Sequence, residues 1–149
     1  MTDLPDDGRR WEPVTDCGPF ADLVGAIYST TDRLDDSEGV RFGFRVAPHQ
    51  CNPRPVCHGG MLATFLDIAL ARGIRMVKDL PAPMPTITMS LDYLAPAMLG
   101  DWIDARVTVT RAGGTCFAQA LLHGPTHPVL RGSGVYKRLR PGGSGPHDG

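Results

Sequence analysis

The sequence predicts an α+β fold, in which one long apolar helix packs against one face of a curved antiparallel sheet. A single segment, residues 59–78, carries apolar residues at helical spacing over a length that suits a central helix. One strand-like segment comes before it, and four follow it without interruption. Packing this helix on the sheet buries the apolar faces of both, which is why the order of elements predicts the architecture.

Before the central helix we expect a short helix and a strand. Residues 20–28 carry apolar side chains at helical spacing, namely Phe20, Leu23, Val24, Ile27 and Tyr28. Residues 39–47 alternate instead and place Val40, Phe42, Phe44 and Val46 on one face, which predicts a strand. Prolines 48, 53 and 55 then predict an irregular loop, because each fixes its own φ and disfavours helix at the residue before it.

The central helix is expected from Gly59 to about Lys78. Its apolar residues wrap much of the circumference, which indicates burial on several sides: Met61, Leu62, Phe65, Leu66, Ile68, Ala69, Leu70 and Met76. Prolines 81, 83 and 85 end the helix. Alternating segments then predict strands over residues 87–93, 103–110, 116–122 and 129–139, with a turn at Ala112-Gly113-Gly114.

The length of 149 residues is that of one domain. We expect a largely disordered segment over residues 1–19, a folded domain over residues 20–140 and a disordered tail over residues 141–149, which is rich in glycine. The formal net charge of -1 gives no case for binding nucleic acid or an anionic membrane. No apolar run approaches the ~20 residues that a membrane span needs.

The spacing of the cysteines indicates the cellular compartment of the protein. Cysteines 17, 51, 57 and 116 form no CxxC pair, and the first residues do not look like a signal peptide. We therefore expect a cytoplasmic protein with reduced thiols.

Chemistry is concentrated at the start and in the middle of the central helix. His58-Gly59-Gly60 opens the helix with two glycines, which allow a ligand to approach the bare backbone. The first amides of a helix lack internal partners and attract negative charge, so this end can stabilise a developing oxyanion. Asp67 lies within the apolar run, where activating a water molecule is one use of a carboxylate. Together they suggest hydrolysis of an acyl bond.

With these residues the chain resembles the hot-dog fold thioesterases, and among them the phenylacetate-pathway (PaaI-type) acyl-CoA thioesterases. The matching residues are Asn52, His58-Gly59-Gly60, Asp67 nine positions after the histidine, and the strand Thr86-Ile87-Thr88-Met89-Ser90-Leu91-Asp92-Tyr93-Leu94-Ala95-Pro96. The resemblance implies that Asp67 is the general base or nucleophile and that the Gly59 amide polarises the thioester carbonyl. It implies also that Asn52 positions water or substrate, and that the Thr86 hydroxyl lies near the attacking water.

The chain departs from the family pattern between Asn52 and His58. Family members often carry a glycine there, whereas this chain has Pro53-Arg54-Pro55-Val56-Cys57. Pro55 removes a backbone donor and stiffens the loop, so Asn52 is placed less securely than Asp67.

The expected substrate contacts are His58, Gly60, Met61, Phe65 and Met89. His58 more often orients a loop by hydrogen bonding than acts as an acid or base. The sequence does not specify the acyl group, nor whether coenzyme A or a carrier protein bears it. Arg131, Lys137, Arg138 and Arg140 fit either solvated strand ends or contacts to coenzyme A phosphates.

No metal or redox cofactor is implied, and coenzyme A enters only as part of the substrate. His49, Cys51, Cys57 and His58 could in principle hold zinc. Their spacing matches no common zinc site, however, and the intervening prolines restrict their convergence.

Helix geometry predicts a shared site. Asp67 follows Gly59 by eight residues, so the two lie about 12 Å apart along one helix and cannot both reach one carbonyl. We therefore expect a homodimer with two equivalent sites, and the resemblance implies dimers that often pair into tetramers.

Two alternatives stay open. One is an acyl-CoA binding or sensing domain without catalysis. The other is a hot-dog hydratase or dehydratase, which predicts that His58 lies beside Asp67.

Overall fold

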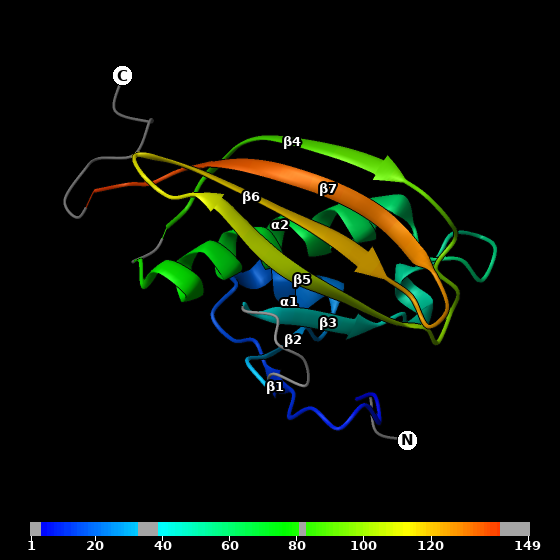
Figure 1. Cartoon of the computed structure of the whole chain (residues 1–149). Coiled ribbons are helices and arrows are strands. Elements are labelled where there is room, and N and C mark those ends of the chain that lie inside the picture. The colour runs from blue at the N-terminus through cyan, green and yellow to red at the C-terminus, as the bar shows by residue number, and fades with distance from the viewer. Residues whose placement is uncertain (1–3, 33–38, 81–82, 141–149) are drawn as a thin grey trace.

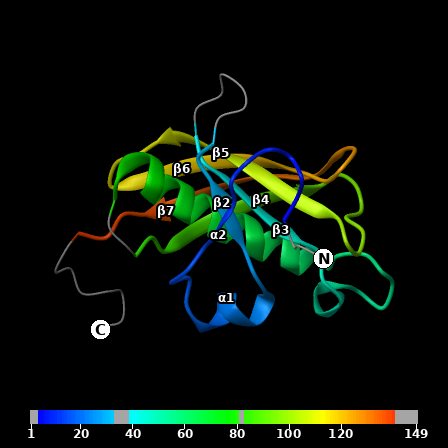
Figure 2. The same cartoon turned by 90° about the horizontal axis from the view of Figure 1, so that it is seen from below.

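A computed structural model describes residues 4–32, 39–80 and 83–140 of the chain. A seven-stranded antiparallel sheet curves around one long helix, α2 (Gly59–Lys78), which lies along one face of the sheet (Figure 1). Viewed from below, α2 crosses the sheet and the short helix α1 (Pro19–Val24) lies to one side (Figure 2). The predicted disorder of residues 141–149 concerns a tail outside the described residues.

The sheet has the strand order β1-β2-β3-β5-β6-β7-β4, with all neighbours antiparallel. The strands are β1 (Glu12–Pro13), β2 (Tyr28–Thr30), β3 (Arg41–Arg45), β4 (Thr86–Tyr93), β5 (Trp102–Arg111), β6 (Thr115–His123) and β7 (Pro128–Lys137). A 3₁₀ turn, η1, spans Pro48–Gln50. Among the described strands β4 pairs with β7 alone, so it forms an open edge of the sheet.

The α+β prediction is confirmed, and α2 has the predicted bounds. Apolar residues on several sides of α2 are buried, among them Phe65, whose ring lies 4.7 Å from that of Phe44 on β3. Burying a side chain of this size contributes about 1.5–3 kcal/mol. Gly73 lets the helix approach β5, since a Cβ there would lie 2.6 Å from Cγ1 of Val107.

The first helix is shorter than its periodicity predicts. Gly25 adopts a φ of 114°, which ends α1 after Val24 and turns the chain into β2. Tyr28 therefore pairs with Gly43 of β3 and does not continue the helix. Phe20 and Leu23 do not enter the core; they are 62% and 77% exposed.

The N-terminal segment has an order that its composition does not predict. Trp11 is only 5% exposed, and its ring packs edge-on against Trp102 of β5 with centroids 5.0 Å apart. Its indole N–H donates to Asp7. An aromatic pair of this kind contributes about 0.5–1.5 kcal/mol beyond area burial. Trp11 thus anchors the residues that add β1 to the sheet.

Candidate active site

At the start of α2, His58 caps the helix. Its Nδ1 accepts the N–H of Gly60 at 2.8 Å, and its own N–H donates to the carbonyl of Gln50 at 2.8 Å. The preceding residue, Cys57, donates its N–H to Ala97. These bonds fix the approach to the helix, so His58 acts on loop and helix geometry within the chain.

Gly59 presents the free donor. Its N–H has no acceptor among the described residues, because Nδ1 of His58 accepts the N–H of Gly60 instead. Its carbonyl accepts the hydroxyl of Tyr93 at 2.8 Å. A Cβ on Gly59 would lie 3.1 Å from the Tyr93 ring, so the site has little room for a side chain. A free amide at the positive end of the helix dipole suits a negatively charged oxygen.

Eight residues further along, Asp67 is held by two hydroxyl groups. Thr86 of β4 donates to Oδ1 at 2.8 Å, and Tyr136 of β7 donates to the same oxygen at 3.0 Å. Among the described residues nothing donates to Oδ2. Asp67 is half-buried, so its second oxygen can meet a water molecule while the first is fixed.

Tyr136 is the residue beside Asp67 that sequence reasoning missed. Its side chain is fully buried. Burial is the main cause that raises the pKa of its hydroxyl above the ordinary value of 10.0, and the charge of Asp67 and its hydrogen bond raise that pKa further. It therefore stays protonated at neutral pH and keeps donating to the carboxylate.

Glycines on β7 make room for this tyrosine. A Cβ on Gly134 would lie 2.6 Å from Cε2 of Tyr136, so the ring lies against the bare backbone of its own strand. A Cβ on Gly132 would lie 2.4 Å from Leu66, so α2 also approaches closely there. Two glycines at alternate positions followed by an aromatic residue are the sequence signal that could have found Tyr136.

A β-bulge aims Thr86 at the helix. The register of β4 against β7 shifts between Thr86 and Thr88. Strict alternation from Met89 would place Thr86 on the face away from α2, yet its hydroxyl reaches Asp67. Bulges of this kind commonly re-aim a side chain beside a site. The Thr86 hydroxyl thus donates to the carboxylate, and its expected place near the attacking water stays a prediction.

The remaining predicted site residues are scattered. Asn52 is exposed on the loop before α2, and its side chain makes no hydrogen bond to another described residue. Phe65 is fully buried against Phe44 and reaches no open surface within one chain. Met89 is half-buried. Among the described residues, hydrogen bonds therefore join Asp67 to Thr86 but not to Asn52.

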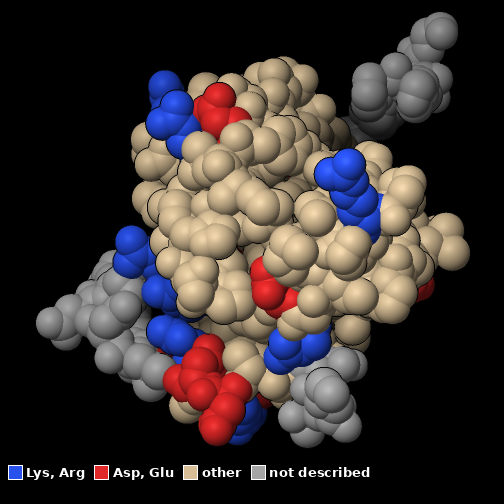
Figure 3. Space-filling model, turned by 90° about the vertical axis from the view of Figure 1, so that its right-hand side faces the viewer, with Lys and Arg blue, Asp and Glu red and all other residues tan. Residues whose placement is uncertain are grey.

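Met61 lines a groove beside the start of α2. The groove has a volume of about 430 Å³ and is lined by Phe20, Leu23, Val24, His49, Gln50, Cys51, His58, Gly60, Met61 and Thr64. Figure 3 views this end of the molecule and shows scattered charges of both signs between uncharged residues.

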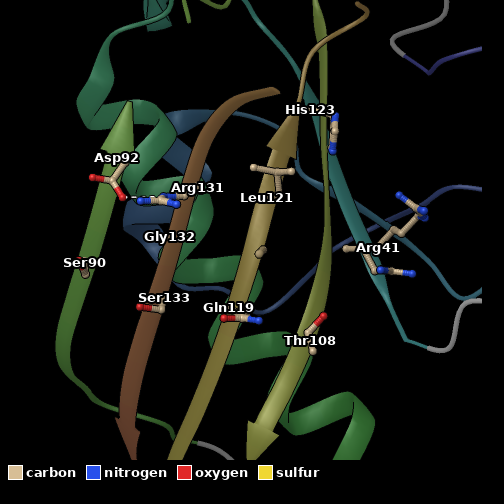
Figure 4. A pocket seen from close by; sticks show the side chains of 12 residues that line it. Arg41, Ser90, Asp92, Thr108, Gln119, Leu121, His123, Arg131, Gly132 and Ser133 are labelled. Carbon is tan, nitrogen blue, oxygen red and sulfur yellow. Dashed lines mark hydrogen bonds and ion pairs between the residues drawn. The ribbon is translucent and has the colours of Figure 1, made fainter. Parts of the chain in front are cut away.

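A larger concavity, of about 700 Å³, lies across strands β4, β7, β6 and β5 on the sheet face (Figure 4). Arg131, for which the sequence left open a solvated strand end or a contact to coenzyme A phosphates, pairs here with Asp92 at 2.8 Å. Neither Asp67 nor Gly59 lines this concavity. It is thus separate from the candidate site.

Two further findings concern ligands and membranes. Within the described ranges no three side chains of His, Cys, Asp or Glu gather as a metal site. Among the described helices none is long and apolar enough to cross a membrane.

Comparison of the sequence with known proteins gives a family and a relative. A family model described as the thioesterase superfamily matches residues 55–118. A curated protein of Pseudomonas aeruginosa named "Putative esterase" is 30% identical over 127 residues, which are 85% of this chain and 92% of that protein.

Several solved structures resemble this chain in fold. Zebrafish thioesterase superfamily member 2 has a TM-score of 0.69 at 23% identity, covering 83% of this chain and 89% of its own. A Thermus thermophilus PaaI protein has a TM-score of 0.66 at 20% identity, covering 82% of this chain and 100% of its own. A Streptococcus pneumoniae hypothetical thioesterase with coenzyme A has a TM-score of 0.62 at 20% identity, covering 73% of this chain and 86% of its own. At these identities the likeness shows a shared fold, and the fold is the hot-dog fold that the resemblance implied.

Proposed function

We propose that this chain, which belongs to the thioesterase superfamily, hydrolyses the thioester of an acyl-CoA to a free acid and coenzyme A. The observation that carries the proposal is the carboxylate of Asp67, with Oδ1 held by Thr86 and Tyr136 and Oδ2 open to water. The coenzyme A in the Streptococcus pneumoniae structure supports the choice of thioester, as does the esterase name of the Pseudomonas relative.

In this reaction Asp67 acts on water. Its carboxylate accepts a proton while the water oxygen attacks the thioester carbon, and the carbonyl oxygen becomes negatively charged. The free amide of Gly59 donates to that oxygen. Collapse of the tetrahedral intermediate breaks the carbon–sulfur bond and releases the thiol, which takes up a proton. Direct attack by Asp67 through an acyl-enzyme anhydride is the second route open to the same arrangement.

A shared site follows from the distance between the two groups. Gly59 and Asp67 belong to one helix and are eight residues apart, about 12 Å along its axis. One carbonyl cannot meet both groups of one chain, so we place Gly59 of one subunit beside Asp67 of another. Two helices related by a two-fold axis give two such sites.

The open edge at β4 is the surface that suits this pairing. No described strand pairs with the outer side of β4, and its residues Ile87 and Tyr93 are 56% and 54% exposed. Unpaired strand edges favour addition of another strand. Tyr93 also donates to Gly59, so this edge lies next to the free amide. The homodimer, and its pairing into a tetramer, are parts of the proposal.

The other expected residues keep supporting roles in the proposal. Asn52, His58, Gly60 and Met89 contact substrate or water, and Met61 contributes to the groove beside the helix start. The chemistry needs no metal or redox cofactor. Within one chain His58 is bonded to Gly60 and lies nine residues from Asp67, so no specific observation favours the hydratase alternative.

The experiment that tests the function is a panel of acyl-CoA esters. Aryl, short-chain and medium-chain esters are incubated with the purified chain, and release of free thiol is followed. We expect one class to be hydrolysed well above the rate without protein. Binding of the esters with no thiol release from any of them contradicts the proposal and favours a binding or sensing domain.

A further inference from the structure

Two cysteines face one another just before α2. The N–H of Asn52 donates to Val56 at 2.9 Å, and the N–H of His58 donates to Gln50 at 2.8 Å. Between these two bonds lies an antiparallel bridge that joins Cys51 to Cys57. Bonds on both sides of the bridge, and none within it, make Cys51 and Cys57 a non-hydrogen-bonded pair.

Such a pair has the spacing of a disulfide. The Cα atoms of directly opposite residues in this position lie about 4.5 Å apart, and their side chains leave the same face. Disulfides accept Cα separations of about 4.4–6.8 Å. Both cysteines are free thiols in this structure, with Cys51 Sγ donating to Ala47 at 3.5 Å and Cys57 Sγ donating to His58 at 3.7 Å. Side-chain rotation and a small backbone adjustment would join the sulfurs.

The two thiols differ in access. Cys57 is 4% exposed. Its burial, and to a smaller extent the charge of the neighbouring Cys51, raise the pKa of its thiol from 9.0 to about 12. Cys51 is half-buried and lines the groove beside the helix start. Because only the thiolate attacks, and only an accessible sulfur meets an oxidant, Cys51 is the first to react.

We infer that Cys51 and Cys57 form an oxidative modification site, which closes into an intrachain disulfide on exposure to a low-molecular-weight disulfide such as oxidised glutathione. In the first step the Cys51 thiolate attacks the oxidant, forms a mixed disulfide and expels one glutathione thiolate. In the second step the Cys57 thiolate attacks the Cys51 sulfur and expels the second glutathione. The protein loses two protons and two electrons, and the oxidant is reduced to two thiols.

The other two cysteines do not share this arrangement. Cys116 is fully buried and lies opposite Tyr136 in the sheet. Cys17 is half-buried, and its sulfur accepts from Arg72 at 3.3 Å. Among the described residues, the structure thus singles out Cys51 and Cys57 for pairing.

The bridge closes the loop that carries Asn52 and ends one residue before the helix cap. A disulfide here restrains residues 52–56 and the approach to His58. The inference concerns covalent chemistry alone, so it stands whether or not the chain hydrolyses thioesters.

The experiment is oxidation of the full chain by oxidised glutathione, followed by mass spectrometry of intact protein and proteolytic peptides. We expect a product two hydrogen atoms lighter than the starting chain. The peptide containing Cys51 and Cys57 should resist alkylation until a reductant is added. A Cys57→Ala variant should instead stop at one bound glutathione on Cys51, and a Cys51→Ala variant should give no bridge.

The opposite results overturn the inference. They are a stable glutathione adduct on the unaltered chain without closure, a bridge that involves Cys17 or Cys116, or complete resistance to oxidation while the chain is folded. Circular dichroism of each variant reports folding. The order of attack is read from the cysteine that remains: a folded Cys57→Ala variant should carry glutathione on Cys51, and a folded Cys51→Ala variant should carry none on Cys57, whereas a glutathione adduct on Cys57 contradicts the order.

Discussion

The two ends of the candidate chemistry on α2 are built in different ways. At the helix start, the donor is the backbone N–H of Gly59, whose direction is set by the helix end that His58 caps, while Tyr93 of β4 donates to the Gly59 carbonyl and not to the donor itself. In the middle, the carboxylate of Asp67 is held by side chains from two distant strands, Thr86 on β4 and Tyr136 on β7. The backbone donor depends on local geometry, whereas the carboxylate depends on how helix and sheet pack.

The largest effect is expected at the carboxylate. Asp67→Asn keeps the size and the hydrogen-bond acceptor for Thr86 and Tyr136 but removes the base. General base catalysis contributes about 10²- to 10⁴-fold, so kcat on the best acyl-CoA should fall by that range. The matched control is Asp92→Asn on the exposed side of β4, which should keep its rate. A wild-type rate in Asp67→Asn removes this carboxylate from the mechanism.

The next effect concerns the backbone donor. In Gly59→Val the new side chain meets Tyr93 and obstructs the free amide, so an oxyanion donor is lost. Loss of one such donor lowers kcat by about 10²- to 10³-fold in other enzymes. Tyr93→Phe is the control, because it keeps the ring and removes only the bond to the Gly59 carbonyl; its effect should be smaller.

Mixing the two inactive variants tests whether both ends serve one carbonyl. If the sites are shared between chains, a mixed dimer of Asp67→Asn and Gly59→Val retains one site with both groups intact. Activity should therefore return after subunit exchange. Exchange shown by native mass spectrometry with no return of activity contradicts the shared site and leaves the two ends of α2 with separate roles.

A smaller effect is expected from the residues that hold the carboxylate. Tyr136→Phe removes one donor to Oδ1, and a hydrogen bond to a charged group contributes about 1.5–3 kcal/mol. If that energy orients Asp67, kcat falls by about 10- to 100-fold with little change in KM. Thr86→Val should act in the same way, while Thr86→Ser should restore the rate. If KM changes by that factor and kcat does not change, the two residues have a packing role only.

The same contrast explains what could be predicted from the sequence. The positions of Gly59 at the start of α2 and of Asp67 within it were predictable, since a glycine pair at a helix start and a carboxylate in an apolar run are local patterns. The direction of Thr86 depends on a bulge, which alternation does not reveal. Tyr136 lies 69 residues from Asp67 in the chain, and its role appears only once β7 packs on α2. Trp11 belongs with these, because its burial needs Trp102 of β5.

The smallest effect is on stability at alkaline pH, where each region has one buried acid. Cys57, before the helix start, has its pKa raised from 9.0 to about 12, and the pKa of Tyr136, beneath Asp67, is raised above 10.0. The unfolded chain therefore releases each proton at a lower pH than the folded chain does. The free energy of unfolding is unaffected below the ordinary pKa and falls as pH rises above it. Each group contributes a slope of at most about 1.4 kcal/mol per pH unit. Urea unfolding at a series of pH values should show that Cys57→Ala lacks the part of the slope that begins near pH 9.0, and Tyr136→Phe the part that begins near pH 10.0. A curve for either variant that is merely displaced and runs parallel to that of the unaltered chain contradicts the burial assigned to that group.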